Sequence, residues 1–196
     1  VSDEMEIYDP CCGSGGFLLS SYQHLTNNKA EELRLHGEER HSDNWAYTKL
    51  SLFLVGDSYS ELGLNSCITA PHFTKDSNQL KQFDIVISAP PFASQNWGSE
   101  LAESDSYNRF GYGMPPKSNG DYAYVSHMLA SLKDNSGFMA VVLPQGALYR
   151  GAAEAKIRQR LIEENLLDTV IVLPEKLLRN TNIPLSILIF KKINLW

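Results

Sequence analysis

The chain of 196 residues is 43% hydrophobic, enough to bury one sizeable core, and its formal charge is −6 at pH 7. This acidity argues against a protein that binds nucleic acid alone, because neutralising phosphates requires clustered lysines and arginines. The three cysteines, Cys11, Cys12 and Cys67, are too few and too scattered for a disulfide framework or a zinc site. No apolar run is long enough to span a bilayer, so we expect a cytoplasmic protein without membrane contact.

Strand and helix patterns alternate along the chain, as in a parallel sheet wrapped by helices. The predicted strands cover residues 5–9, 34–38, 66–70, 84–88, 138–143, 169–173 and 185–191. The predicted helices cover residues 16–26, 44–54, 122–132 and 153–164. The last two strands have no helix between them, and so short a connection cannot carry a parallel crossover. The sequence therefore predicts an α/β fold with a seven-stranded, mostly parallel, doubly wound sheet and an antiparallel last strand.

A glycine-rich loop follows the first predicted strand. This strand ends at Asp9, and Gly13, Gly15 and Gly16 precede a helical pattern that starts at Phe17. Glycines let a ligand approach the backbone closely, as in a nucleotide-type cofactor loop. The GxGG spacing differs from the GxGxxG of dinucleotide sites, and an acid at the strand end suits a ligand with an ammonium or sulfonium charge. An ordinary strand-to-helix turn is the alternative.

Two acids, Glu38 and Glu39, end the second predicted strand. Doubly wound folds place a carboxylate at this distance on ribose hydroxyls. A carboxylate accepts two hydrogen bonds and can hold a vicinal diol, and we assign this role to Glu39. Taken alone, such an acid is more often a solvated loop residue, but Asp9 and the glycines favour a cofactor site.

The fourth predicted strand ends on a rigid, apolar corner, Ala89-Pro90-Pro91-Phe92. An irregular stretch, residues 93–121, follows and is rich in Gly, Ser, Asn and Pro. A loop of that length in a compact domain is usually functional or disordered. We expect the tips of the first and fourth strands to lie side by side.

Several blocks of sequence resemble, in order, the modification (M) subunit of type I restriction-modification systems. They are DPCCGSGGFL, GEE, FDIVISAPPF, RFGYGMPPKSNGDYAYVSHML, GFMAVVLPQGALYRGAAEAKIRQRLIEENLLDTVIVLP and TNIPLSILIFKK. That family consists of adenine-specific DNA methyltransferases that use S-adenosylmethionine and have a seven-stranded, Rossmann-like methyltransferase fold. The resemblance implies double-stranded DNA with a flipped base as substrate, and the DNA specificity and restriction subunits as partners. Because a core strand begins almost at the first residue, we expect residues 1–196 to be a single catalytic domain from a longer chain.

The family's first motif and its ribose-binding acid match the cofactor loop and the end of the second strand. The cofactor-binding residues implied are Asp9, Pro10, Gly13, Ser14, Gly15, Gly16, Phe17 and Glu39. The family also tends to place an acid after the third strand, near the cofactor adenine. Here Ala70 and Pro71 stand where that acid is expected, and Asp57 is an alternative, so this contact stays unassigned.

The family's catalytic motif, Asn-Pro-Pro-Phe, corresponds to Ala89, Pro90, Pro91 and Phe92. The resemblance implies that the Asn side chain and the first Pro carbonyl accept hydrogen bonds from the adenine amine, while Phe stacks on the flipped base. Ala89 removes one acceptor, so we expect the chain to bind cofactor but to methylate poorly or not at all. Ser88 and Ser94 are nearby hydroxyls, but alternation along the strand turns Ser88 the other way.

Polar residues beyond the corner have both structural and functional interpretations. Asp121 caps or complements a helix terminus, and Arg109 is a surface charge, or else Arg109 and Lys117 lie near DNA phosphates. His127 is expected to pack in the core or to be exposed, without a chemical role.

Other functions remain open at this stage. They are methylation of RNA or of a protein glutamine amide, and a decayed assembly subunit that holds a complex together. A dehydrogenase is disfavoured by the GxGG spacing.

Overall fold

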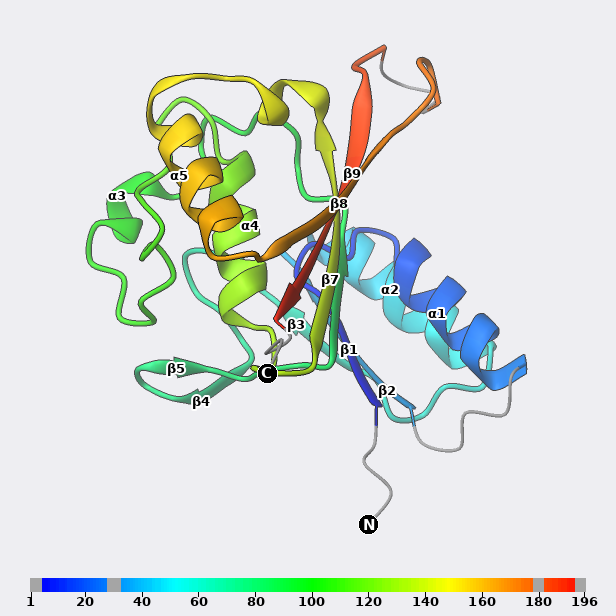
Figure 1. The fold of residues 1–196 in the computed structure, drawn as a ribbon. Helices are drawn as coiled ribbons and strands as arrows, with labels where there is room; N and C mark the ends of the chain where they lie inside the picture. The colour runs from blue at the N-terminus through cyan, green and yellow to red at the C-terminus, as the bar shows by residue number, and fades with distance from the viewer. Residues whose placement is uncertain (1–4, 28–32, 178–181, 193–196) are drawn as a thin grey trace.

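A seven-stranded sheet in the order β3-β2-β1-β6-β7-β9-β8 forms the centre of the computed structural model (Figure 1), which describes residues 5–27, 33–177 and 182–192. Its strands are β1 (Met5–Asp9), β2 (Leu33–Glu39), β3 (Glu61–Leu64), β6 (Ile85–Ser88), β7 (Gly137–Pro144), β8 (Leu167–Val172) and β9 (Leu185–Lys192). Neighbouring strands from β3 to β7 are parallel, whereas β9 runs antiparallel to both β7 and β8. The predicted fold class, including the antiparallel last strand, is confirmed.

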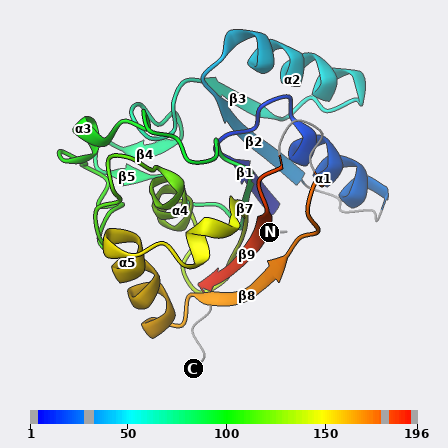
Figure 2. The ribbon, with the colours of Figure 1, turned by 90° about the horizontal axis from the view of Figure 1, so that it is seen from above.

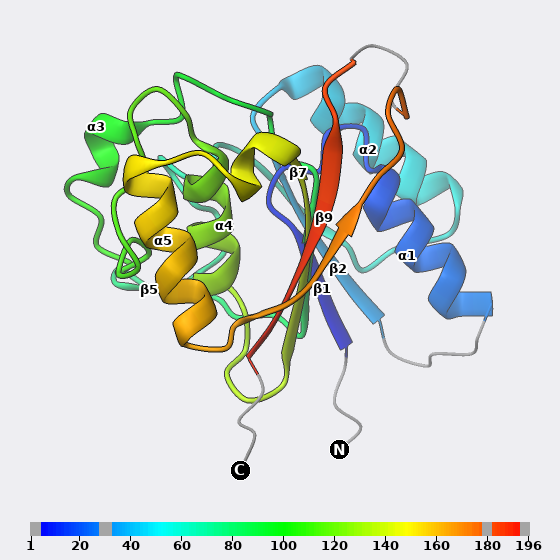
Figure 3. The ribbon, with the colours of Figure 1, turned by 45° about the horizontal axis from the view of Figure 1, so that its top comes forward.

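Helices cover both faces of this sheet. α1 (Gly16–Asn27) and α2 (Ser42–Leu54) lie on one face, and α4 (Asp121–Ala130) and α5 (Ala152–Glu163) lie on the other (Figures 1 and 3). Every residue of α4 from Asp121 to Leu129 is buried. Viewed from above, α4 lies between the sheet and the loop that carries the short helix α3 (Ser99–Ala102) (Figure 2). The remaining short elements are the hairpin β4 (Thr74–Asp76) and β5 (Gln79–Leu80), and the 3-10 helix η1 (Gln145–Leu148).

The sheet separates two apolar layers, because successive residues of a strand point to opposite faces. On β1, Ile7 packs in the cluster with Leu18 of α1, whereas Tyr8 packs in the cluster with Met128 of α4. A sheet buried on both faces produces the nearly continuous apolar runs that made most strands recognisable from sequence.

The third strand was predicted in the wrong place. It covers Glu61–Leu64, whereas residues 66–70 form a turn in which the Ala70 N–H donates to the Ser66 carbonyl at 2.9 Å. β3 is an edge strand of four residues with both ends exposed, so its apolar signal is weak. Cys67 and Ile68 resemble a buried strand because they pack in a separate cluster with Trp97.

The long stretch after the corner is partly structured. It contains α3, and Trp97 is buried and donates its indole N–H to the Pro116 carbonyl at 3.1 Å. These contacts connect distant parts of the stretch, so it is neither a linker nor an extended arm.

Candidate active site

A pocket of about 260 Å³ opens where β1, β2, β3 and β6 end. The strand order reverses between β1 and β6, and ligands of open α/β sheets bind at such switch points. The loop after β1, the end of β2, the turn after β3, the corner after β6 and α4 all contribute to its lining. The lining residues are Pro10, Cys11, Gly13, Glu38, Glu39, Arg40, His41, Asn44, Asn65, Ser66, Cys67, Ala89, Pro91 and Tyr124.

The tips of β1 and β6 lie side by side, as expected from the sequence. Tyr8 pairs with Val86 in the parallel ladder, and the Ser88 hydroxyl donates to Asp9 Oδ1 at 2.7 Å. Ser88 is therefore engaged below the pocket. Ser94, which carries the other hydroxyl near Ala89, lies close to the Tyr124 side chain.

The glycine loop combines a pocket wall with a helix contact. Gly13 lines the pocket with φ at +56°, and a side chain built there would meet nothing within 4 Å. At Gly15, with φ at +83°, a Cβ would lie 2.7 Å from Thr48 Cγ2 of α2. The Thr48 hydroxyl also donates to the Gly13 carbonyl at 2.7 Å. Close packing of the loop on α2 therefore requires Gly15, whereas Gly13 keeps the pocket wall open.

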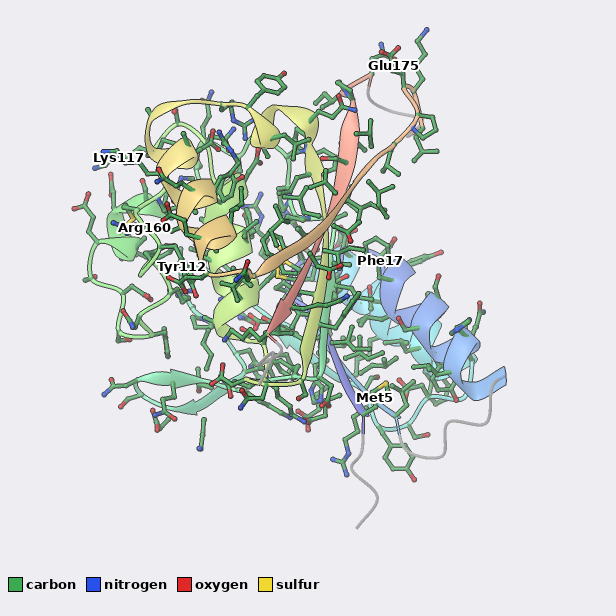
Figure 4. All side chains as sticks on the ribbon, in the orientation of Figure 1. Met5, Phe17, Tyr112, Lys117, Arg160 and Glu175 are labelled. Atoms are coloured by element: carbon green, nitrogen blue, oxygen red, sulfur yellow. The ribbon has the colours of Figure 1, made fainter. Side chains whose placement is uncertain are left out.

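The other loop residues predicted from the sequence fall into two groups. Pro10 lines the pocket together with Gly13. Ser14, Gly16 and Phe17 do not line it, and Phe17 is 39% exposed at the start of α1 (Figure 4).

Asp9 is buried beneath the loop. It is 1% exposed, and its Oδ1 accepts hydrogen bonds from the Cys11 N–H at 3.0 Å and from Ser88. Burial raises the pKa of Asp9 to about 7, although these two hydrogen bonds oppose the shift and the nearby Glu39 charge adds to it. Asp9 thus supports the loop from below and does not line the pocket.

This raised pKa predicts a pH-dependent stability. The folded chain keeps the Asp9 proton up to about pH 7, whereas the unfolded chain releases it near its ordinary pKa of 3.8. The contribution of Asp9 to the free energy of unfolding therefore falls as pH rises through this window, by about 4 kcal/mol in total. Asp9→Asn keeps an oxygen for both donors but does not titrate. We expect the variant to gain stability relative to the parent between pH 4 and pH 8, measured by urea unfolding. If the difference in free energy of unfolding between the variant and the parent stayed constant from pH 4 to pH 8, the raised pKa of Asp9 would be wrong.

The two acids that end β2 have different surroundings. Both line the pocket, and Glu39 Oε1 accepts the His41 N–H at 2.7 Å. Glu38 is fully buried and accepts the Tyr8 hydroxyl at 2.6 Å. Burial raises the pKa of Glu38, whereas its hydrogen bonds from Tyr8 and Asn65 lower it. Glu38 is thus held in an internal network, and Glu39 is the acid better placed to receive a ligand.

Asn65 occupies the position directly after β3, which the misplaced strand prediction had assigned to Ala70 and Pro71. Its side-chain N–H groups donate to Glu38 Oε2 and, at 2.7 Å, to the Ala70 carbonyl. Its Oδ1 is buried and has no partner among the residues that the structure describes. The pocket therefore has an amide with an unpaired acceptor here. Asp57 precedes the start of β3, so it lies toward the amino-terminal end of that strand and does not line the pocket.

The proline corner forms one side of the pocket. Ala89 and Pro91 line it, Pro90 is buried, and Phe92 is half-buried. Tyr124, which the sequence did not single out, completes this side from α4. No local pattern distinguishes it from its buried neighbours, and only its place in the GDYAYVSHML block pointed to this region.

Two of the three cysteines that looked scattered come together at the pocket. The thiols of Cys11 and Cys67 are 3.9 Å apart, both residues line the pocket, and all three cysteines are free. Their mutual hydrogen bond and burial raise the pKa of Cys11. In the described part of the chain, no three His, Cys, Asp or Glu side chains gather as a metal site.

Both interpretations of Arg109 were wrong, because it is neither a surface charge nor a residue placed for phosphates. It is 5% exposed and donates to Asp105, and to the Cys67 carbonyl at 3.0 Å. Its neighbour His127 lies 3.0 Å from the Tyr8 hydroxyl and is buried, and burial with the Arg109 charge lowers its pKa. His127 therefore packs in the core as expected. Lys117 lies at the outer edge of the molecule (Figure 4) and pairs with Glu103 at 3.1 Å.

Comparison with known proteins agrees with this arrangement. A family model described as N-6 DNA methylase matches residues 1–195. The chain belongs to the N-6 DNA methylase family. The MjaVII type I restriction enzyme methylase subunit of Methanocaldococcus jannaschii is 32% identical to this family member over 98% of the chain and 33% of the relative. The HindI methylase subunit of Haemophilus influenzae is 29% identical over 92% of the chain and 40% of the relative.

A solved structure extends the similarity of this family member to three dimensions. The type I restriction-modification system methyltransferase subunit from Streptococcus thermophilus matches it with a TM-score of 0.85 at 30% identity. The match covers 99% of this chain and 41% of that one. The chain thus spans between a third and about two fifths of the length of these three proteins. Within the described residues, no helix has the length and apolar character needed to cross a membrane.

Proposed function

We propose that the chain is the catalytic domain of a type I modification subunit, a fragment of a longer cytoplasmic chain. Its proposed reaction is methyl transfer from S-adenosylmethionine to the N6 amine of an adenine in double-stranded DNA. The observation that carries this proposal is a single pocket bounded by the glycine loop, Glu39 and the proline corner. The curated relatives are methylase subunits of type I restriction enzymes, which favours this reaction.

The hydrogen-bond acceptors of the pocket fit the proposed cofactor. Glu39 offers a carboxylate for the ribose diol, and the buried Oδ1 of Asn65 offers an acceptor for an N–H group. Gly13 leaves space against the backbone, and Pro91 and Cys67 supply apolar contact. S-adenosylmethionine supplies an electrophilic methyl group when bound. The chain's own residues bind and orient it, and they present the target amine.

The proposed site for the target base is the proline corner. The exocyclic amine of adenine is a poor nucleophile because its lone pair is delocalised into the ring, so acceptors held against its hydrogens assist attack. Pro90 offers a carbonyl on a backbone that two prolines stiffen, and Phe92 offers a ring for stacking on a flipped base. Ala89 offers no acceptor, so we infer that this chain transfers methyl groups slowly or not at all.

The acidic charge of the chain favours delivery to DNA by a partner. The proposed partners are the DNA specificity subunit and the restriction subunit of the same system. They would supply basic groups for contact with the DNA phosphates.

Calorimetry with S-adenosylmethionine tests the proposal first. We expect saturable binding to the chain, because every residue proposed to hold the cofactor is present. An assembly subunit that has lost its cofactor site would give no binding heat, and that result would overturn the proposal. Incubating Ala89→Asn and labelled cofactor with DNA, RNA or a glutamine-containing protein then identifies the substrate. Incorporation into RNA or protein but not into DNA would contradict the proposed substrate.

A further inference from the structure

The chain leaves the proline corner through an unusual backbone conformation at Ala93. Its φ is +49°, a left-handed value that residues with side chains rarely adopt. Such a conformation persists only where the surrounding structure holds it. Ala93 directly follows Phe92, so the peptide unit between them sets the direction of the corner's last residue.

Asp121 holds that peptide unit. The Ala93 N–H donates to Asp121 Oδ1 at 2.9 Å, and Asp121 is completely buried at the first position of α4. Next to it, the Gly120 N–H donates to the Ser94 carbonyl at 2.9 Å. Asp121 lies in the first turn of α4, where a carboxylate complements the helix dipole. Its hydrogen bond, however, goes to the corner, so it has a further role beyond the predicted one at the helix terminus.

The second oxygen of Asp121 is held by Arg150, which lies between η1 and α5. The Arg150 guanidinium donates to Asp121 Oδ2, and it also binds both oxygens of Glu154, at 2.5 and 3.0 Å. Arg158 donates to the Arg150 carbonyl at 2.8 Å, which fixes the backbone as well. A carboxylate buried at this depth requires a cation and a donor, and Asp121 has Arg150 and Ala93.

We propose that Asp121, held by Arg150, is a positioning residue for the proline corner in the methyl transfer proposed above. It touches neither the cofactor nor the base. It fixes the Phe92–Ala93 peptide unit and, through it, the direction of the Phe92 ring and of the Pro90 carbonyl. The inference rests on the proposed function for its catalytic consequence, but the hydrogen bond can be tested separately.

A matched control comes from a second buried carboxylate. Asp105 also accepts a backbone N–H, from Arg109 at 2.7 Å, and also pairs with an arginine side chain, that of Arg109, at 2.6 Å. Its side chain is 6% exposed, and its hydrogen bonds do not reach the corner. Asp105→Asn therefore reproduces the general cost of altering a buried ion pair without releasing Ala93.

The first measurement uses the chain with Ala89 in place and does not depend on methyl transfer. Hydrogen exchange of the Ala93 amide, followed by NMR, is expected to be at least about tenfold faster in Asp121→Asn and Asp121→Ala than in the parent. Ala93 and Arg150 donate to different oxygens of Asp121, and asparagine keeps an acceptor oxygen at only one of these two positions. Asp105→Asn is expected to leave this amide protected. Equal exchange in the parent and both Asp121 variants would overturn the proposal.

The second measurement places the same substitutions in an Ala89→Asn background. We expect Asp121→Asn to lower kcat by on the order of 10²-fold, because a small misplacement of reacting groups has an effect of this size. The dissociation constant for S-adenosylmethionine is expected to stay within about threefold of the parent, since Asp121 does not line the pocket. Arg150→Lys keeps the charge but loses the forked geometry, and is expected to lower kcat less. It also provides the test if Asp121→Ala does not fold.

The outcomes separate the two proposals. A kcat for Asp121→Asn equal to that for Asp105→Asn would overturn the positioning role, as would a loss of cofactor affinity in proportion to kcat. If Ala89→Asn itself transfers no methyl group, the proposed function fails. The exchange of the Ala93 amide then still decides whether Asp121 holds the corner.

Discussion

Replacing Ala89 with asparagine is expected to raise methyl transfer to DNA by on the order of 10² to 10³-fold, the effect of one preorganised hydrogen-bond partner in comparable sites. Ala89 lines the pocket at the end of β6, where a side-chain oxygen would lie beside the Pro90 carbonyl. In the proposed reaction the two acceptors together would receive both hydrogens of the target amine, whereas with Ala89 one hydrogen would stay unpaired. Labelled methyl incorporation into DNA at saturating cofactor measures the difference.

Ala152→Asn is a suitable control for this substitution. It adds the same side chain at an exposed residue, and asparagine tolerates the left-handed φ of +54° found there. We expect no gain in methyl transfer from it, because residue 152 lies outside the pocket lining. Equal rates for Ala89→Asn, Ala152→Asn and the parent would show that the side chain at position 89 does not assist the reaction.

The second large effect is expected at Glu39. Glu39→Ala should weaken S-adenosylmethionine binding by about 10 to 100-fold, because hydrogen bonds to a charged group contribute about 1.5–3 kcal/mol. Glu39 is 8% exposed and lines the pocket. Removing its carboxylate would therefore leave the ribose hydroxyls without a strong acceptor. Calorimetry on the parent and the variant measures the change in dissociation constant.

A cofactor analogue that lacks the ribose 2′-hydroxyl distinguishes this contact from general damage. The analogue should bind the parent more weakly than the natural cofactor does, and Glu39→Ala should then cost it little further affinity. Glu61→Gln changes an exposed acid at the start of β3, whereas the pocket lies beyond the end of that strand. This variant should leave cofactor binding unaltered. If Glu39→Ala weakened both ligands equally, the ribose assignment would be wrong.

Local sequence signals were sufficient for β1, β2 and β6, three of the four strands whose ends form the pocket, because these strands lie inside the sheet and are covered on both faces. Asp9 and Ser88 end apolar runs at their respective strand tips, and glycines or prolines follow. The edge strand β3 was missed because it has only four residues, two of them exposed, and so gives little pattern; Asn65 was missed as a consequence. β3 lacks the β-branched run that made the other edge strand, β8, recognisable.

Other site residues depend on contacts that no short pattern records. Tyr124 lies on a helix that is buried all round, so periodicity does not mark the face directed at the pocket. Arg109 looked like a surface charge because its partners, Cys67 and His127, are 42 and 18 residues away in sequence. Charged side chains with tertiary partners of this kind become recognisable only when the fold is known.

The pocket is assembled from five segments that lie far apart along the chain, from Pro10 to Tyr124. No single supersecondary unit contains it, so it forms only when the non-local pairing of β1, β2, β3 and β6 is complete. Occupancy of the pocket is therefore thermodynamically linked to folding of the whole sheet: a ligand that binds only the native state stabilises every strand together. Ligand concentration would then influence how long the domain survives in a cell, whether or not it turns over substrate.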